Sequence, residues 1–386
     1  MPDNKPMFAK ILVAITEDWF LLSHFRPLIA ELRQLAREAV VVTRASDRIA
    51  EVQSLGVRTI ELDYNRSSMN PVREAATVRQ FTRILRAEKP DVLHLIAMKP
   101  IVLGGLASAI AHAPHTVVHM TGLGFLAISP TLKARAARAV ALAILRRVIA
   151  PPTSWLVVEN PEDLAFLKEG GVEPEARVTI LGGAGIDPIA FPELPEPAAT
   201  LPIAAFVGRM ILPKGVDVLM QAAGLLKARG VPLGIELYGR SDDGNLEAIP
   251  SSVLTSWSDG ERTRWLGFTS DVAAIWRRAA IFVLPARSRE GMPRALLEAA
   301  ASARPLIVTD VPGCRHFVRD GVEGLIVPPA DAKALADALE KLARDPALRR
   351  KLGLAARARL LDGYTEADVR AGLARTYRAL TSSTGT

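Results

Sequence analysis

The chain contains 386 residues, of which 49% are hydrophobic and 23% charged, so it can bury substantial cores and is not a disordered chain. Its length exceeds what one hydrophobic core usually serves, which makes two domains the expected organisation. The formal net charge of +7 favours an anionic partner such as a nucleotide, a phospholipid surface or a nucleic acid.

Five continuous apolar runs in the first half predict buried strands. They cover 9–16, 37–44, 91–97, 115–122 and 154–160. Stretches with helical spacing, such as 25–38, lie between them. Because the runs lack strict polar alternation, they indicate strands covered on both faces, as in the parallel sheets of α/β proteins.

The alternation pauses in the proline-rich stretch 185–202 and then resumes with apolar runs at 202–208, 233–239, 279–286 and 304–310. We therefore predict an α/β fold with two Rossmann-like, doubly wound parallel-sheet domains. The amino-terminal domain covers 1–185 and is joined by a last amphipathic helix at 366–382. A linker covers 186–202, and the carboxy-terminal domain covers 203–365.

The first candidate site follows the apolar run 279–286. Loops at the carboxyl ends of parallel strands bind ligands, and Pro293 suits the first turn of the helix that follows. The amides of Gly291 and Met292 at the start of that helix would attract a phosphate. Glu290 would lie at the edge of this site and Glu298 on the second helical turn, where a carboxylate can accept hydrogen bonds from sugar hydroxyls. The alternative is a surface ion pair between Arg294 and Glu298.

The second candidate site follows the run 202–208. Gly208 ends the predicted strand, Arg209 and Lys214 follow in the loop, and Gly215 opens a helix, so two cations and a helix amino terminus could neutralise a diphosphate. Solvated loop charges are the alternative.

The motifs "FVGRMILPKG" and "EGMPRALLEAAASARPLIVTD", in this order and at this separation, resemble family 4 of the retaining GT-B glycosyltransferases. The similarity spans the carboxy-terminal half. It implies the GT-B fold, in which two Rossmann-like domains face a cleft, and a metal-independent hexosyltransferase that needs no cofactor. No Asp-x-Asp motif or His/Cys ligand cluster occurs in the sequence, which agrees with that implication.

The resemblance also implies roles for the matching residues. Arg209 and Lys214 would bind the nucleotide diphosphate, and Glu290 with the Gly291 and Met292 amides would lie near the donor sugar. Glu298 would hold the ribose. The segment "WLGFTSDV" is similar to the loop that holds the base, which makes Phe268 and Thr269 candidates for backbone contacts. A UDP-sugar is the expected donor.

The amino-terminal half contains the segments "DWFLLSHFRPLIAELR", "DVLHLIAMKPIVLGGLAS", "HMTGLGFLA" and "VVENPEDLAFL". These segments resemble a bacterial subset of the family that extends polyprenyl-diphosphate-linked glycans for surface polysaccharide, including lipopolysaccharide. His119 lies where related enzymes place a histidine against the donor sugar, although a structural histidine is the alternative. His94 is interpreted as structural. Ser23 and His24 replace the family's frequent Gly-Gly and, with Thr121, are candidates for acceptor binding.

For the mechanism, the resemblance implies that the acceptor attacks from the face that the diphosphate leaves. Arg209, Lys214 and the helix amides would stabilise the departing charge, and domain closure would exclude water.

The expected location is the cytoplasmic face of the inner membrane, with peripheral association. One cysteine, Cys314, excludes an internal disulfide, and no leader or apolar run of about 18 residues predicts export or a spanning helix. The segment 131–149 carries five basic residues and no acidic one, so it could lie on anionic headgroups. A packed helix with a solvated basic edge is the alternative.

Other functions remain open at this point. A GT-B-like sugar-nucleotide epimerase would share the diphosphate site but need no lipid acceptor. A non-catalytic nucleotide-sugar-binding or membrane-binding subunit would be expected to lack the site residues. Nucleic-acid binding is not expected because no zinc-finger or RNP-type motif occurs, and a dehydrogenase is disfavoured because "GGAG" at 182–185 does not fit Gly-x-Gly-x-x-Gly.

Overall fold

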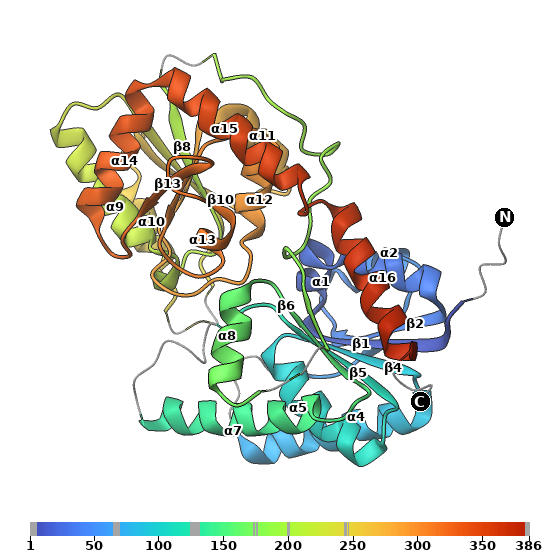
Figure 1. The fold of residues 1–386 in the computed structure, drawn as a ribbon. Coiled ribbons are helices and arrows are strands. Elements are labelled where there is room, and N and C mark those ends of the chain that lie inside the picture. Colours follow the sequence, from blue (N-terminus) through green and yellow to red (C-terminus); the bar gives the residue numbers. More distant parts are fainter. Residues whose placement is uncertain are drawn as a thin grey trace, which may run out of the picture. The chain divides into compact units, whose positions relative to one another are not determined.

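The computed structural model describes residues 6–64, 70–123, 132–172, 174, 177–198, 201–242, 245 and 247–382, with the side chains of 132–134 and 382 left aside. Two compact units divide the chain: residues 1–185 with 366–386 form unit 1, and residues 186–365 form unit 2 (Figure 1). Unit 1 is therefore discontinuous in sequence, because its last helix follows the whole of unit 2.

Unit 1 contains a seven-stranded sheet in the order β3-β2-β1-β4-β5-β6-β7, and all pairings between the described strands are parallel. The strands are β1 (Phe8–Glu17), β2 (Ala36–Arg44), β3 (Arg58–Glu61), β4 (Val92–Ile96), β5 (His115–Met120), β6 (Ser154–Val158) and β7 (Val178–Ile180). The helices are α1 (Asp18–His24), α2 (Arg26–Leu35), α3 (Ile49–Ser54), α4 (Pro71–Glu88), α5 (Met98–Ala111), α7 (Leu132–Ile149), α8 (Pro161–Glu169) and α16 (Glu366–Ser382).

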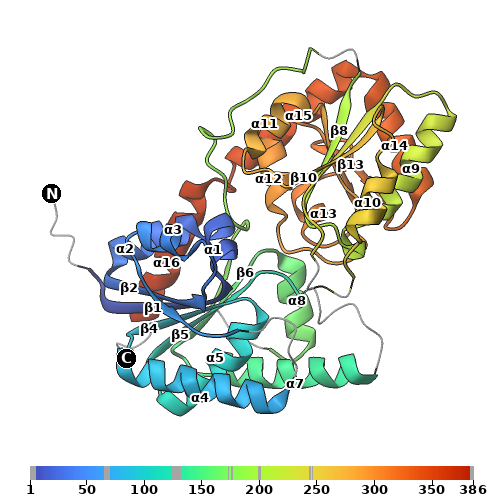
Figure 2. The same cartoon turned by 180° about the vertical axis from the view of Figure 1, so that it is seen from behind.

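Alternate residues of β1 enter two separate cores. Ile11, Val13 and Ile15 pack on the face covered by α2 and α16, whereas Leu12 and Ala14 pack on the face covered by α4, α5 and α7 (Figure 2). Both faces are thus buried, which explains the continuous apolar runs of the sequence.

The last helix completes the first of these cores. Val369, Leu373, Tyr377 and Leu380 lie three or four residues apart, so they share one side of α16, and all are buried with β1 and α2. Unit 1 therefore needs residues from both ends of the sequence to close its core.

Unit 2 has a six-stranded parallel sheet in the order β10-β9-β8-β11-β12-β13. The strands are β8 (Ile203–Val207), β9 (Gly234–Tyr238), β10 (Thr263–Gly267), β11 (Ile281–Leu284), β12 (Leu306–Thr309) and β13 (Gly324–Val327). The helices are α9 (Val216–Ala228), α10 (Ser251–Trp257), α11 (Val272–Arg278), α12 (Arg294–Ala301), α13 (Cys314–Phe317), α14 (Ala332–Arg344) and α15 (Pro346–Leu361), with a short 3-10 turn, η1, at Leu212–Lys214.

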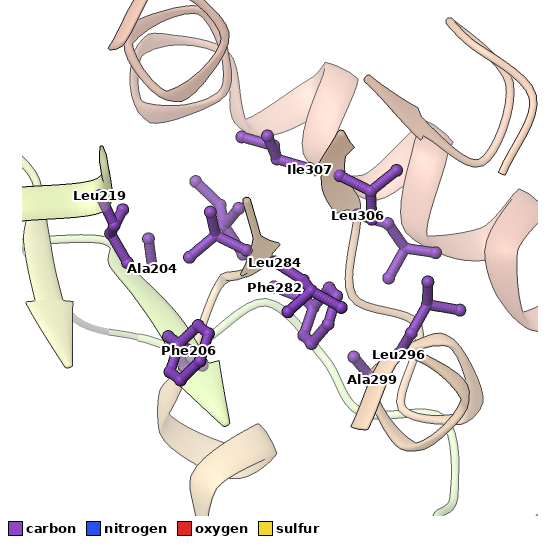
Figure 3. Packing of buried hydrophobic residues seen from close by; sticks show 14 of the residues in the cluster. Ala204, Phe206, Leu219, Phe282, Leu284, Leu296, Ala299, Leu306 and Ile307 are labelled. Carbon is purple, nitrogen blue, oxygen red and sulfur yellow. The ribbon is translucent and has the colours of Figure 1, made fainter. Parts of the chain in front are cut away.

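The core of unit 2 joins its central strands to α12. Phe206 of β8, Phe282 of β11 and Leu296 of α12 are fully buried in one cluster (Figure 3). This packing fixes the helix that carries Glu298 against the middle of the sheet.

The proline-rich stretch has no helix or strand in its described parts, residues 185–198 and 201–202. It is nonetheless tied to unit 2, because Arg304 Nη1 donates to the Pro195 carbonyl at 2.9 Å and Arg349 Nε donates to Glu196 at 2.7 Å. Among the helices that the structure describes, none combines the length and apolar character needed to cross a membrane.

Candidate active site at the carboxyl ends of β8 and β11

The order of strands in unit 2 reverses between β8 and β11. In a doubly wound sheet, ligands bind at the carboxyl ends of the two strands where this reversal occurs. The loop after β8 contains Arg209 and Lys214, and the loop after β11 contains Glu290. The Arg287 amide donates to the Pro213 carbonyl at 2.8 Å, so the two loops are held together. The sequence motifs therefore meet at one place in the fold.

Gly215 permits this close approach. Its φ is +72°, and a Cβ atom here would lie 1.8 Å from the Pro285 carbonyl oxygen at the end of β11. No other residue type fits this position without moving one of the two loops.

Lys214 and Glu290 are in direct contact. Lys214 Nζ lies 2.8 Å from Glu290 Oε2, and the two side chains are only 19% and 15% exposed. An ammonium group has three hydrogens to donate, so Lys214 can keep Glu290 and still bind a phosphate oxygen. The pair joins the two candidate sites predicted from the sequence.

Arg209 has a different partner. Its Nη1 donates to Asp242 Oδ2, from the loop after β9, at 2.8 Å. Sequence analysis missed Asp242, for which the only signal is its place just after the run 233–239. The expectation that Arg209 and Lys214 bind one diphosphate stays a prediction.

The loop at Glu290 is fixed by the turn after β12. The Glu290 amide donates to the Pro312 carbonyl at 3.1 Å, and a Cβ at Gly313 (φ +83°) would lie 2.0 Å from the Gly291 carbonyl oxygen. Gly291, Met292 and Pro293 are all buried. Helix α12 begins at Arg294, so Pro293 caps it rather than lying in its first turn, and its carbonyl accepts from Leu296 N at 3.1 Å.

Glu298 is a buried carboxylate on the second turn of α12, and 5% of the residue is exposed. Arg294 Nε donates to Glu298 Oε1 at 2.7 Å, so the ion pair considered as the alternative does form, but it is not a surface pair. Burial raises the pKa of Glu298, and the charge of Arg294 opposes this effect. Burial of a carboxylate is costly unless the carboxylate is paired, and the Arg294 guanidinium supplies that partner here.

Phe268 and Thr269 follow the edge strand β10. Phe268 is 58% exposed, and the Arg240 guanidinium carbon lies 4.6 Å from the centroid of its ring. Thr269 Oγ1 accepts from the Asp271 amide at 3.1 Å, which shapes the turn into α11. An exposed ring with a stacked cation can support a planar base. Arg240 was not predicted from the sequence.

His119 belongs to unit 1, where it lies on β5 and is buried. Its Nδ1 lies 3.2 Å from His94 Nε2, and His94 Nδ1 lies 2.6 Å from the Tyr377 hydroxyl. The Phe25 ring packs edge-on against His119 at 5.3 Å. Burial lowers the pKa of His119 to about 3 and that of His94 well below its ordinary value, so both rings are neutral near pH 7.

The candidate acceptor residues follow β1 and β5. Ser23 Oγ lies 2.7 Å from His24 Nδ1 and donates to the Phe20 carbonyl at 3.1 Å, near the end of α1. Thr121 is half-buried and directly follows β5. The donor-side residues belong to unit 2 and His119, Ser23, His24 and Thr121 to unit 1.

No group of three potential metal ligands occurs among the described residues. The predicted basic segment forms α7, except for Thr131, which lies outside the described residues.

Both halves of the chain match families of glycosyltransferases. Residues 202–345 match the family described as glycosyl transferases group 1, and residues 10–150 match the family described as glycosyl transferase 4-like. The two matches together span most of the chain.

Curated relatives are similar over much of their length. The N,N'-diacetylbacillosaminyl-diphospho-undecaprenol alpha-1,3-N-acetylgalactosaminyltransferase of Campylobacter jejuni is 25% identical over 342 residues, which cover 85% of this chain and 88% of that protein. The UDP-Gal:alpha-D-GlcNAc-diphosphoundecaprenol alpha-1,3-galactosyltransferase of Escherichia coli is 26% identical over 300 residues, which cover 72% of each chain.

Among solved structures, Anabaena HepE in complex with UDP and glucose superposes with a TM-score of 0.77 at 16% identity, covering 96% of this chain and 99% of that one. This likeness concerns the fold, and it confirms the predicted pair of Rossmann-like domains of the GT-B type.

Proposed function

Because this chain belongs to the group 1 and 4-like glycosyltransferases, we propose that it moves a sugar from a nucleotide-sugar donor to a polyprenyl-diphosphate-linked saccharide during surface polysaccharide synthesis. The use of a nucleotide-sugar donor is supported mainly by one observation, the Lys214–Glu290 pair. This pair lies where the strand order of the group 1 domain reverses. The acceptor half is supported by the two relatives from Campylobacter jejuni and Escherichia coli, whose names specify undecaprenyl-diphosphate-linked saccharides.

In the proposed reaction, the bond between the anomeric carbon and the diphosphate oxygen breaks while an acceptor hydroxyl bonds to the same face of that carbon. The proton of the hydroxyl passes to the departing diphosphate, and the anomeric configuration is retained. Lys214 and Arg209 stabilise the charge that develops on the diphosphate. Glu290, held by Lys214, accepts hydrogen bonds from the donor sugar. No metal ligand is required in this scheme.

The nucleotide is proposed to extend from β8 toward β10. Glu298 accepts from the ribose hydroxyls, while the Phe268 ring with Arg240, and the backbone at Thr269, hold the base. We propose UDP as this nucleotide, which the name of the Escherichia coli relative supports.

We also propose that α7 holds the enzyme at the inner membrane surface on its cytoplasmic side. Arg135, Arg146 and Arg147 are exposed, as is Val140, while Leu142 and Leu145 pack inward. The helix contains no acidic residue. A basic face with apolar residues between the charges fits anionic headgroups.

The test begins with nucleotide binding. We expect UDP or a UDP-sugar to raise the melting temperature of the protein, since a ligand at 100 times its Kd stabilises by about 2.7 kcal/mol. The shift should be lost in the Arg209→Ala/Lys214→Ala variant. The variant Lys227→Ala/Arg229→Ala is the matched control, because these cations pair with Asp259 and Asp337 on the surface of the same unit.

The second step is turnover with a prenyl-diphosphate-linked saccharide. Transfer that requires both donor and acceptor would support the proposal. Conversion of the donor sugar to an epimer without acceptor would contradict it in favour of an epimerase, and nucleotide binding without any turnover would favour a non-catalytic subunit.

A further inference from the structure

Glu236 is a buried carboxylate in the middle of β9 that the proposed reaction does not use, and only 1% of the residue is exposed. Its Oε1 accepts from Arg264 Nη2 of β10 at 2.5 Å and from Arg278 Nη2, at the end of α11, at 2.8 Å. The Tyr238 hydroxyl donates to its Oε2. Burial and this bond raise the pKa of Tyr238, so the hydroxyl keeps its hydrogen. One carboxylate oxygen is therefore shared by two guanidinium groups.

The register of the sheet explains why three of these side chains meet. Glu236 is paired with Arg264 across β9 and β10, and Tyr238 lies two residues beyond Glu236. Side chains of paired residues, and of every second residue in a strand, project from the same face of a sheet. Because β10 is an edge strand, the Arg264 guanidinium at this face can also reach solvent.

The charges of this cluster are not balanced. Two guanidinium groups share one carboxylate, so one positive charge is left over. Among the described residues, Glu236 is the only hydrogen-bond partner of Arg264 and of Arg278, and their side chains are 42% and 53% exposed. A guanidinium has several N–H donors, so most donors of both groups are open to solvent. An anion that bridges the two groups would also offset the repulsion between them.

A pocket of about 460 Å³ opens beside the cluster, within the range of about 300–1,000 Å³ that is typical of small-molecule sites. One part of its wall is charged and the other part is apolar or lacks a side chain. The charged part is Glu236, Glu261, Arg262 and Arg264, and the other part is Ala198, Leu201, Ile203 and Gly234. Such a wall suits a ligand that joins an anionic group to an apolar group.

The pocket lies at the end of the sheet opposite the candidate active site. Ile203 and Gly234 begin β8 and β9, and Arg262 directly precedes β10, so the pocket is at the amino ends of these strands. The candidate active site follows the carboxyl ends of β8 and β11. A ligand of this pocket is therefore distinct from the proposed nucleotide.

We propose that this pocket binds a small organic phosphate monoester. The phosphate accepts hydrogen bonds from Arg264 and Arg278, which Glu236 holds side by side, and the organic part packs on Leu201 and Ile203. A planar guanidinium can donate to two phosphate oxygens at once. A phosphate monoester has three terminal oxygens and can serve two such groups, whereas a carboxylate has only two. The inference does not depend on the proposed function.

The test uses the full-length protein with Arg209→Ala/Lys214→Ala, so that the candidate diphosphate site does not contribute. Methyl groups of leucine and isoleucine are labelled with ¹³C, and the Leu201 and Ile203 signals, assigned with Leu201→Val and Ile203→Val, are followed by NMR during titration with phenyl phosphate. We expect saturable shifts of both signals. Inorganic phosphate should bind at least about fivefold more weakly, because it has no apolar part to bury. Neutral benzyl alcohol should cause no saturable shift.

In the same background, Arg264→Gln and Arg278→Gln should each raise the Kd for phenyl phosphate by roughly tenfold or more, since each removes hydrogen bonds between charged groups. Arg277→Gln is the matched control, because Arg277 precedes Arg278 on α11, is 57% exposed and pairs with Asp271 instead of Glu236. Its Kd should stay that of the background protein.

The absence of saturable shifts with phenyl phosphate, or an equal loss of affinity in all three variants, would overturn the site. Equal affinity for phenyl phosphate and inorganic phosphate would overturn the organic ligand, and equally tight binding of benzyl alcohol would overturn the role of the arginines. A failure of the nucleotide to bind at the candidate active site would change none of these outcomes.

Discussion

Glu290 lies in the loop before α12 and Glu298 lies on that helix, and the two carboxylates have different surroundings. Glu298 is buried beside Arg294, whereas Glu290 is held by Lys214 across the meeting point of two loops. A buried carboxylate keeps a fixed position and suits a hydroxyl pair that does not react, such as a ribose. Because Glu290 is paired with the cation proposed to bind the diphosphate, we propose that it lies nearer the reacting bond.

The first prediction concerns nucleotide affinity. Glu298→Ala should raise the Kd for the nucleotide by roughly ten- to a hundredfold, since hydrogen bonds to a charged group contribute about 1.5–3 kcal/mol. Isothermal titration calorimetry measures this change. Glu323→Ala is the matched control, because Glu323 is also buried and paired with an arginine four residues earlier, Arg319. Glu323 directly precedes the edge strand β13, so it lies at the amino ends of the strands, away from the candidate site.

Glu290→Gln should show the reverse pattern, with slower transfer and a Kd for the nucleotide close to that of the wild type. The amide keeps the size of the side chain but removes the charge that orients Lys214. If neither variant changed binding or turnover, the assignment of both carboxylates would be wrong.

The second prediction concerns pH. Below pH 6.5 the histidines of the unfolded chain become protonated, whereas His119 stays neutral in the folded protein down to about pH 3. The unfolded state then binds more protons, so stability falls as pH falls, by about 1.4 kcal/mol per pH unit for each such histidine. Denaturant unfolding between pH 6.5 and 4.5 should show a smaller loss for His94→Gln/His119→Gln. The exposed His112→Gln serves as the control, and an equal loss in all three proteins would contradict the prediction.

At the scale of elements, two glycines decide whether the loops of unit 2 can meet. Gly215 brings the start of α9 against the end of β11, and Gly313 brings the turn after β12 against Gly291. The geometry of the candidate site thus depends on close backbone contacts at two glycines, which have no side chain.

The third prediction follows from this contact. Gly215→Ala should destabilise unit 2 by roughly 2–4 kcal/mol, through left-handed strain and overlap with Pro285, and should separate Lys214 from Glu290. Gly230→Ala is matched to it, because Gly230 also has a positive φ of +66° but no atom lies within 4 Å of its Cβ position. The control should lose only about 1 kcal/mol. Thermal unfolding and nucleotide affinity measure both effects, and equal losses would contradict the role of the contact.

The strands that were predicted from the sequence lie inside the two sheets, and the strands that were missed lie at the edges. All nine predicted runs are strands, and the four that were missed, β3, β7, β10 and β13, are the four edge strands of the two sheets. Edge strands are covered less, and Arg58–Glu61 and Val178–Ile180 contain partly exposed residues instead of a continuous apolar run. Hydrophobic patterning detects burial on both faces and therefore misses them.

The residues of the candidate site that lie in loops after apolar runs could be predicted from the sequence. The contacts between these side chains could not. Lys214 and Glu290 were recognised because each lies in a loop after an apolar run. Their contact, and the partners Asp242 and Arg240, depend on the order of strands in the sheet. Tyr377 could not be linked to His94 because 283 residues separate them in sequence.

At the scale of the whole molecule, much of the net charge of +7 comes from α7, which has five basic residues and no acidic residue. Its exposed arginines, Arg135, Arg146 and Arg147, form the outer side of a helix whose inner side packs on unit 1. The sequence offered a packed helix and a membrane-binding helix as alternative interpretations of this segment. The structure is compatible with both at once, because the packed side and the basic side of α7 are different.

The fourth prediction tests this surface. Arg135→Gln/Arg146→Gln/Arg147→Gln should weaken binding to vesicles that contain anionic lipid by at least about tenfold, since each basic residue near such a surface contributes about 1 kcal/mol. Lys333→Gln/Lys341→Gln/Arg344→Gln removes the same charge from the exposed side of α14 and should bind as the wild type does. Co-sedimentation at two salt concentrations measures both variants. Equal weakening would mean that only total charge matters.

The discontinuity of unit 1 has a consequence for how the protein is made. A ribosome synthesises seven strands of unit 1 first, then all of unit 2, and only then the helix that supplies Val369, Leu373 and Tyr377. Until that helix emerges, one face of the first sheet has only part of its cover, and His94 lacks its hydroxyl partner. A nascent chain that stalls anywhere within unit 2 would therefore leave the apolar surface that α16 covers exposed to solvent.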